Sequence, residues 1–220
     1  MSDSCILALQ EVLARVNDAP VDYAVTDFLI GDVRHCSALL GRELTAAEDE
    51  QVLISETEHG AELSVYIDEQ VVHRLSENDP LYCLSDANLA DFCTALEGVS
   101  HFQYLTWCLE RRRQVSLLEL ELQAEVDKYA VATYLLLRQS RSDLHADLHR
   151  RLFSQVDFLP SLDEASRQRY REANRGAARF CRRNDQRFLC CRQPRVERWF
   201  SELRSLYRCG HHEKLRRALH

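Results

Sequence analysis

Glycine and proline are scarce in this chain, with 6 Gly and 4 Pro among 220 residues. Turns between strands draw heavily on these two residues, so their shortage disfavours a loop-rich all-β fold. Long apolar runs are also missing: no stretch approaches the roughly 18 apolar residues of a membrane-spanning helix. Residues 1–10 contain neither the basic region nor the cleavage site of a signal peptide. We therefore expect a mainly helical protein with no membrane partner.

Several familiar motifs are absent as well. The sequence contains no G-x-G-x-x-G, no Walker A loop and no G-x-S-x-G, which disfavours the familiar nucleotide-dependent enzymes and serine hydrolases. Its nine cysteines lack the paired spacing of a structural zinc site. Nine cysteines without a secretory signal are typical of reduced thiols, so we expect a cytoplasmic protein.

The composition that remains is that of a globular chain, 45% hydrophobic and 29% charged. The clearest strand signal covers residues 51–67, where two runs flank a short loop and Leu63, Val65 and Ile67 alternate on one face. From residue 85 onward the periodicity is helical. We predict an α+β, predominantly α fold: a small N-terminal module over residues 1–84 that contains the hairpin, followed by a six-helix domain over residues 85–220.

Two long helices dominate the predicted helical domain. Residues 86–112 and 116–139 have helical periodicity, and Ser116 with Glu119 forms a capping box at the start of the second helix. Because only residues 113–115 separate the two helices, we expect them to fold back as an antiparallel pair.

The first candidate site lies on this helix pair. Glu97 and His101 are four residues apart, so both side chains can reach one ion. The facing helix contributes Glu121 and Glu125 within an otherwise apolar segment, and we expect His101 to lie level with about Lys128. Three carboxylates and a histidine between antiparallel helices predict a divalent transition-metal site, or acid–base catalysis by Glu97, His101 and Glu125. The competing interpretation is structural, with Glu125 paired to Lys128, and no second E-x-x-H element supports a di-metal centre.

His145 and His149 form a second candidate metal site. They are one helical turn apart, a spacing that can chelate zinc or complete the ligand shell of the first site. Ala146, however, stands where the H-E-x-x-H motif of metalloproteases has glutamate. Both histidines border the apolar stripe of their helix, so a boundary position is the simpler interpretation.

Charge is divided unequally along the chain, whose net charge is −7. Residues 1–140 carry 9 Lys and Arg against 25 Asp and Glu, whereas residues 141–220 carry 19 against 10. This division predicts either that the two halves dock on one another or that the basic half binds an anionic partner.

The most regular feature is a row of arginines at every fourth position of a predicted helix, which places them along one face. This arginine ridge consists of Arg167, Arg171, Arg175, Arg179, Arg183 and Arg187. Arginine forks suit carboxylate and phosphate oxygens, but no nucleic-acid-binding signature accompanies them. A solvated face, or a contact with the acidic half, is the alternative that requires no partner.

Three functions are compatible with these features. A non-enzymatic interaction or adaptor protein needs the fewest coincidences: its arginine ridge and acidic half would bind a protein partner with an acidic surface, or a second copy of the chain. The first alternative is a helical metal-dependent enzyme with a Glu/His site between the two long helices. The second is a nucleic-acid-binding helical protein, which the acidic net charge disfavours. The sequence leaves open whether the chain is an enzyme.

Overall fold

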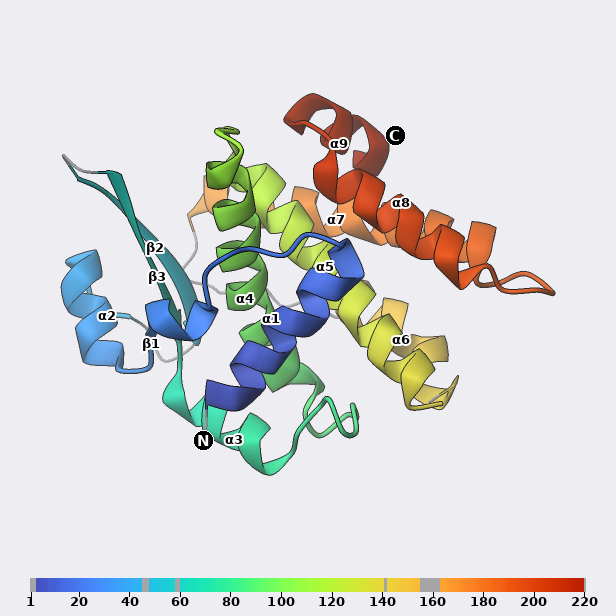
Figure 1. Cartoon of the computed structure of the whole chain (residues 1–220), viewed down its shortest axis with the longest axis horizontal. Coiled ribbons are helices and arrows are strands. Elements are labelled where there is room, and N and C mark those ends of the chain that lie inside the picture. The colour runs from blue at the N-terminus through green and yellow to red at the C-terminus, as the bar shows by residue number, and fades with distance from the viewer. Residues whose placement is uncertain (1–2, 45–47, 58–59, 141, 155–162, 220) are drawn as a thin grey trace.

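A computed structural model describes residues 3–44, 48–57, 60–140, 142–154 and 163–219 (Figure 1). Its elements begin with α1 (Asp3–Asn17), the 3-10 helix η1 (Val25–Phe28), β1 (Leu29–Ile30), α2 (Val33–Leu40), β2 (Glu50–Thr57), β3 (Gly60–Ile67) and α3 (Glu69–Glu77). They continue with α4 (Leu89–Glu110), α5 (Leu117–Arg138), α6 (Ser142–Ser154), α7 (Glu164–Phe188), α8 (Val196–Arg208) and α9 (His211–Leu219). The predicted α+β, predominantly α fold is confirmed: the hairpin lies in the N-terminal part, and the described residues from 85 onward contain six helices, α4 to α9.

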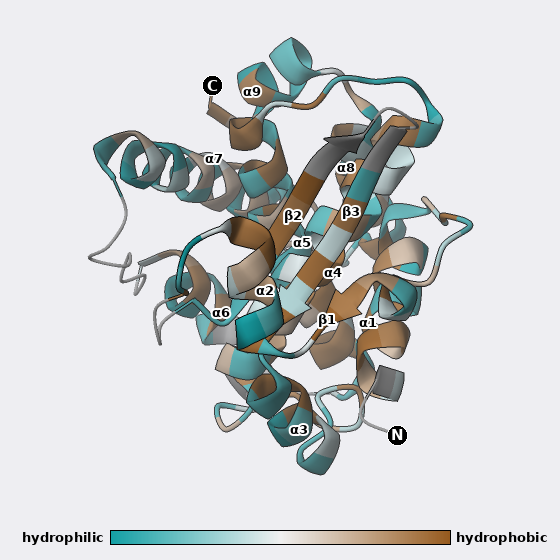
Figure 2. Ribbon diagram, turned by 90° about the vertical axis from the view of Figure 1, so that its left-hand side faces the viewer, coloured by the Kyte–Doolittle hydropathy of each residue, from teal (hydrophilic) through white to brown (hydrophobic). Residues whose placement is uncertain are grey.

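The sheet has three strands in the order β1-β3-β2. β2 and β3 form the predicted hairpin, with Glu50 opposite Ile67 and Val52 opposite Val65, and β1 pairs with β3 in parallel. The period-two alternation of a strand turns Val65 and Ile67 toward α4. The sheet therefore lies between α4 and α2, as seen edge-on in Figure 1 and from the side of α2 in Figure 2.

The long helices α4 and α5 are antiparallel, as predicted, but the chain reverses earlier than expected. Arg112 has a φ of 51°, and the amide of Arg113 donates a hydrogen bond to the carbonyl of Cys108. This left-handed residue ends α4, and the next residues already lead toward α5. Glu121, rather than Lys128, consequently lies beside His101, which corrects the expected register by about two helical turns.

Core residues lie on both sides of the predicted boundary at residue 84. Leu75 and Leu84 belong to the same buried cluster as Phe92 and Leu96 of α4. The helices α4 and α5 are buried around most of their circumference, which explains their nearly continuous apolar sequence. Within the described part of the chain, no helix combines the length and the apolarity that crossing a bilayer requires.

A buried polar network attaches α9 to this helix pair. Lys214 has an exposed fraction of 0%, and its ammonium donates hydrogen bonds to the side-chain oxygen of Gln123 at 2.6 Å and to the hydroxyl of Tyr104. That hydroxyl donates in turn to Glu119 at 2.6 Å. Burial lowers the pKa of Lys214 to about 8, although the charge of Glu119 opposes the shift. Hydrogen bonds from this buried ammonium to side chains of α4 and α5 thus attach α9 to the helix pair.

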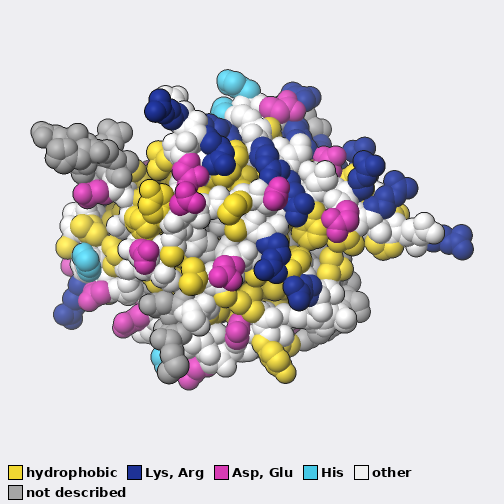
Figure 3. Space-filling model, in the orientation of Figure 1, with side chains coloured by type: hydrophobic (Ala, Val, Ile, Leu, Met, Phe, Trp, Pro, Cys, Tyr) yellow, Lys and Arg dark blue, Asp and Glu magenta, His cyan; other side chains and the backbone are white. Residues whose placement is uncertain are grey.

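Arginines of α8 bind the end of α1. Arg204 donates a hydrogen bond to the carbonyl of Val16 at 3.0 Å, and Arg208 donates to the carbonyl and the carboxylate of Asp18. Cations are favourable at the carbonyl end of a helix. In Figure 3, Lys and Arg gather on the side of α8 and α9, whereas Asp and Glu prevail on the side of the sheet. Docking of the basic half on the acidic half, one of the two expectations from the charge division, is thus observed at this contact.

Candidate functional site

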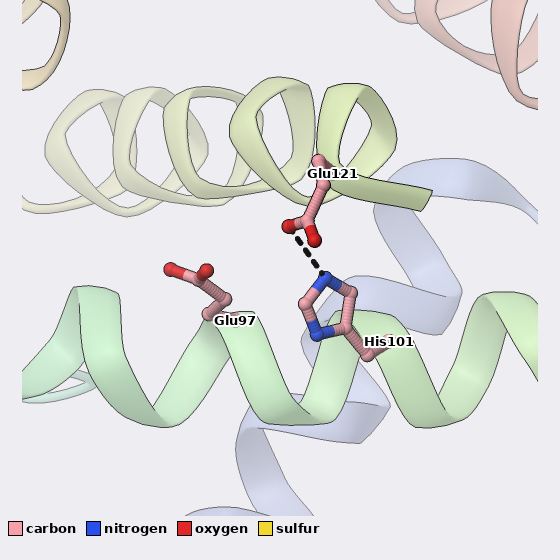
Figure 4. A group of neighbouring side chains, drawn as sticks. All are labelled: Glu97, His101 and Glu121. Carbon is pink, nitrogen blue, oxygen red and sulfur yellow. Dashed lines mark ion pairs between the residues drawn. The ribbon is translucent and has the colours of Figure 1, made fainter. Parts of the chain in front are cut away.

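Three side chains that can bind a metal converge between α4 and α5 (Figure 4). Glu97 and His101 stand one helical turn apart on α4, and Glu121 reaches them from α5. One possible ligand atom from each residue lies within 4.8 Å of the others. The structure thus brings together three of the six residues that the sequence analysis named as metal ligands.

The imidazole of His101 lies between two carboxylates. Its Nδ1 is 3.3 Å from Oε1 of Glu50, and its Nε2 is 3.5 Å from Oε2 of Glu121. The side chain is only 7% exposed, and Nε2 has no hydrogen-bond partner among the described residues. Buried polar atoms without a partner are uncommon in folded proteins. Here the unpartnered nitrogen points toward Glu121, with Glu97 beside it (Figure 4).

Glu50, the first residue of β2, is the member of this cluster that sequence reasoning missed. The strand reaches His101 because α4 has a glycine at the crossing: a Cβ on Gly98 would stand 3.1 Å from Cγ of Glu50 and 3.0 Å from Cγ1 of Val65. The sequence does contain a signal for this position. Glu50 shares a strand face with Val52, so an acidic residue extends a face that otherwise packs on the core.

Lys128 lies between Glu97 and Glu125. Its ammonium donates hydrogen bonds to Oε2 of Glu97 and to Oε1 of Glu125, each at 2.8 Å. The other oxygen of Glu125 is 3.5 Å from the side-chain amide of Asn174 on α7. Glu125 is therefore engaged by Lys128 and lies outside the three-residue group. Lys128 contacts one oxygen of Glu97 and leaves the second available to a cation.

Together these residues form a buried acidic cluster, which consists of Glu50, Glu97, Glu121 and Glu125. The cationic groups that face it are Lys128, His101 and Arg169, whose Nε lies 3.9 Å from Glu121. Burial raises the pKa of Glu50 and of Glu125. Burial acts in the same direction on Glu97, but the charge of Lys128 outweighs it and the pKa of Glu97 is lowered.

Protonation of His101 compensates part of this negative charge. Burial alone lowers the pKa of the imidazole, but its interactions with Glu121 and Glu50 outweigh burial and hold the pKa well above the ordinary value of 6.5. The carboxylates around His101 therefore favour the protonated imidazole in the metal-free cluster. A divalent cation that bound Nε2 would displace this proton and neutralise the same carboxylates.

The second candidate metal site, on α6, is described for one of its two histidines, His149, which has partners outside the acidic cluster. The Nε2 of His149 is 2.8 Å from the carbonyl oxygen of Ala178, to which it donates, and the ring packs against Tyr129 and Phe153. This hydrogen bond engages one of the two ring nitrogens of His149, and His149 is not part of the group of possible metal ligands among the described residues. The side chain of His145 is not among those that the structure describes.

The arginine ridge lies on the outer face of α7, but several of its members have partners within the chain. Arg179 donates a hydrogen bond to the carbonyl of Leu219 at 2.8 Å, and Arg183 donates to that of Arg217, so both bind the carbonyl end of α9. At the other end of the ridge, Arg167 and Arg171 pair with Glu164. Arg175 and Arg187 are exposed and form no ion pair with the described residues.

Comparisons with models of protein families, with curated proteins and with solved structures found no match to this chain. The function is therefore inferred from the side chains and their arrangement.

Proposed function

We propose that this chain binds one divalent first-row transition metal ion between α4 and α5, and that it is a metal-dependent enzyme. The ligands are Glu97, His101 and Glu121. The observation that carries the proposal is the convergence of three possible ligand atoms around the buried Nε2 of His101, which lies 3.5 Å from Oε2 of Glu121 and, with an oxygen of Glu97, forms a group whose atoms are all within 4.8 Å of one another. A histidine with two carboxylates suits Mn²⁺, Fe²⁺ or Zn²⁺, because imidazole and carboxylate ligands are both common for these ions.

The spacing of the three side chains supports this assignment. Ligand bonds of about 2.0–2.2 Å place the ligand atoms of one ion roughly 3–4 Å apart. The present atoms lie within 4.8 Å of one another, so small side-chain rotations bring them to that distance. The backbone of α4 and α5 does not need to move.

Glu50 would act on the metal through His101. Metal-bound histidines commonly donate their second ring N–H to a carboxylate, which fixes the tautomer and the orientation of the ring. Glu50 stands 3.3 Å from Nδ1, where it accepts that hydrogen bond and leaves Nε2 free to bind the ion.

Three protein ligands leave at least one coordination position open. This is the arrangement of catalytic zinc sites, whereas structural sites are closed by four protein ligands. Glu97, 24% exposed, is the least buried of the three ligands, so the ion and a substrate would enter from its side. A metal ion in such a site lowers the pKa of a bound water or polarises a carbonyl or phosphoryl oxygen. Glu125 has both oxygens engaged, by Lys128 and by Asn174, so its role would be to hold Lys128 beside Glu97.

The first experiment is elemental analysis by mass spectrometry of tag-free protein purified without chelator, followed by calorimetric titration of the metal-free protein with Zn²⁺ and Mn²⁺. We expect one transition metal ion per chain and a loss of affinity of more than about 10-fold in His101→Gln. His149→Gln on α6 is the matched control and should bind like the wild type. Glu121→Gln repeats the test if His101→Gln does not fold.

Two results would overturn the metal proposal: absence of binding by the wild type, or equal binding by wild type and His101→Gln. The open position has its own test, because Co²⁺ absorption reports coordination. We expect added azide to change the spectrum of the Co²⁺-substituted protein. An unchanged spectrum would mean a closed, structural site.

A second candidate function is the binding of an acidic protein partner, or of a second copy of the chain, by the arginine ridge. It is supported by Arg175, an exposed guanidinium at the middle of the ridge that has no ion pair among the described residues. Salt-sensitive association that Arg175→Glu abolishes would support it. Association unaffected by Arg175→Glu would exclude the ridge, and affinity for duplex DNA or RNA that falls steeply with salt would favour a nucleic acid instead.

A further inference from the structure

A pocket of about 480 Å³ opens between α7, α8 and α9, and none of its lining residues belongs to the acidic cluster. Its volume is within the range of roughly 300–1,000 Å³ that is usual for small-molecule sites. Four of its lining side chains are arginines, Arg183 and Arg187 from α7 and Arg216 and Arg217 from α9. We refer to it as the arginine pocket.

Two of these four charges are neutralised within the chain. Arg216 forms a bidentate pair with Glu213, at 2.7 and 2.8 Å, and Arg217 pairs with Glu202 of α8 at 2.9 Å. Glu202 is itself part of the pocket wall. The pair of Arg217 with Glu202 links α9 to α8, whereas Arg216 and Glu213 are both residues of α9.

The other two charges remain uncompensated. Arg183 donates a hydrogen bond to a backbone carbonyl, that of Arg217, which carries no net charge. Arg187 forms no ion pair with the described residues, and its guanidinium lies 5.0 Å from the centre of the Phe188 ring. The pocket therefore has an excess of two positive charges.

The remaining wall of the pocket consists of two aromatic rings, Phe180 and Phe188, and the side chain of Asn184, whose amide donates a hydrogen bond to the carbonyl of Trp199. Phe180 and Phe188 belong to the molecular core and present part of their rings to the pocket. A ligand that fits must consequently combine an anionic head with an organic body. A free inorganic anion would use only the charged half of the site.

We propose that the arginine pocket binds a phosphate monoester. Such a group carries a charge of about −1.5 to −2 at neutral pH, which matches the uncompensated charge of Arg183 and Arg187. Its three oxygens suit the planar donor forks of arginine. The ester's organic part would lie against Phe180 and Phe188. This site is independent of the metal centre and differs from the partner surface at Arg175, which lies on the ridge but does not line the pocket.

The test is calorimetric titration at constant ionic strength with three probes: inorganic phosphate, adenosine monophosphate and a short phosphoserine peptide. We expect saturable binding of at least one ester, tighter than that of inorganic phosphate. Tighter binding of the nucleotide identifies a small-molecule ligand, and tighter binding of the peptide identifies a phosphorylated protein.

Arg187→Gln should weaken ester binding by about 10-fold or more, because it removes a charge-assisted hydrogen bond. Arg187→Lys, which keeps the charge and loses the fork, should give an intermediate value and guards against a folding defect. Arg175→Gln removes the same charge from the same helix outside the pocket and should change binding less than about 2-fold. The proposal would be overturned by absence of saturable binding for every probe, or by equal losses in Arg175→Gln and Arg187→Gln.

Discussion

The carboxylates on either side of the imidazole of His101 determine its protonation and its capacity to bind a metal. Glu50 approaches one ring nitrogen and Glu121 the other, and both favour the protonated ring. A metal ion and a proton therefore compete for the same nitrogen. We expect metal binding to strengthen as the pH rises and to release a proton.

At the residue scale, protonation of His101 should make the unfolding free energy of the metal-free protein depend on pH. Because the folded pKa of His101 lies above its unfolded value, the stabilisation is fully present below about pH 6.5 and is lost as the pH rises through the folded pKa. The difference in unfolding free energy between wild type and His101→Gln should therefore shrink above pH 6.5. Urea denaturation at a series of pH values measures it. His73→Gln, at a histidine that is 67% exposed, is the control for the substitution itself.

A second residue-scale prediction concerns Glu50. Glu50→Gln removes the charge beside Nδ1 while keeping the size of the side chain, so the pKa of His101 should fall and metal affinity should drop by about 10–100-fold. NMR titration of the imidazole and calorimetry with Zn²⁺ measure the two effects. Glu62→Gln, at an exposed position of the same hairpin, should change neither. Unaltered values in Glu50→Gln would show that the carboxylate does not orient the ring.

At the scale of elements, the contact between β2 and α4 depends on Gly98. A methyl group there would meet Val65 at 3.0 Å, Glu50 at 3.1 Å and Ile67 at 3.3 Å, so the sheet would have to move away from the helix. We expect Gly98→Ala to destabilise the fold by about 1–3 kcal/mol, because overpacking exceeds the gain in helix propensity. Thermal or urea unfolding measures the loss, and metal affinity should fall with it because Glu50 is displaced.

Gly210→Ala is the matched control for this substitution. A Cβ on Gly210 would have no atom within 4 Å, and its φ is not positive. Its stability should therefore stay close to that of the wild type. A Gly98→Ala variant as stable as Gly210→Ala would contradict the close contact.

Elements were predictable from sequence where a local pattern specifies them. The alternation of Leu63, Val65 and Ile67 identified the hairpin, and the Ser116 hydroxyl accepts the predicted capping bond from the amide of Glu119. The four-residue spacing of Glu97 and His101 likewise placed both side chains on one face of α4. These features depend on residues that are close together in the chain.

Contacts between distant segments were not predictable in the same way. The residue of α5 that lies beside His101 is set by the position at which the chain reverses after α4. The reversal occurs at Arg112, which has a positive φ that nothing in the local sequence specifies. Glu50 reaches the site through a contact between a strand and a helix that are about fifty residues apart in the chain. Predicting this contact would have required the knowledge that β2 and β3 cross α4 at Gly98. The two members of the site that sequence reasoning misplaced or missed, Lys128 and Glu50, both belong to this class.

At the scale of the whole molecule, the buried Lys214 makes the unfolding free energy vary with pH in the alkaline range. Its pKa is about 8 in the folded chain and 10.5 when exposed, so between these values the unfolded chain binds a proton that the folded chain does not. Unfolding free energy should therefore rise with pH across this window, by roughly 3 kcal/mol in total for this group. Lys214→Met should abolish that rise.

Denaturation in urea at pH 8 and at pH 10 compares the two proteins directly. Other groups titrate in this range, so the informative quantity is the difference between wild type and Lys214→Met. A difference that stays constant with pH would contradict the lowered pKa. NMR titration of the Lys214 ammonium in the wild type gives the same answer if the variant does not fold.

The contact between α8 and α1 has a consequence for the order of folding. The hydrogen bond between Arg204 and Val16 joins residues that are 188 positions apart in the chain. This contact therefore closes one of the longest loops among the described residues. During synthesis, α1 leaves the ribosome before α8, so its last carbonyls gain their arginine partners only after α8 has emerged. The packing of α1 is thus completed only when α8 arrives, and a nascent chain that ends before α8 exposes the end of α1.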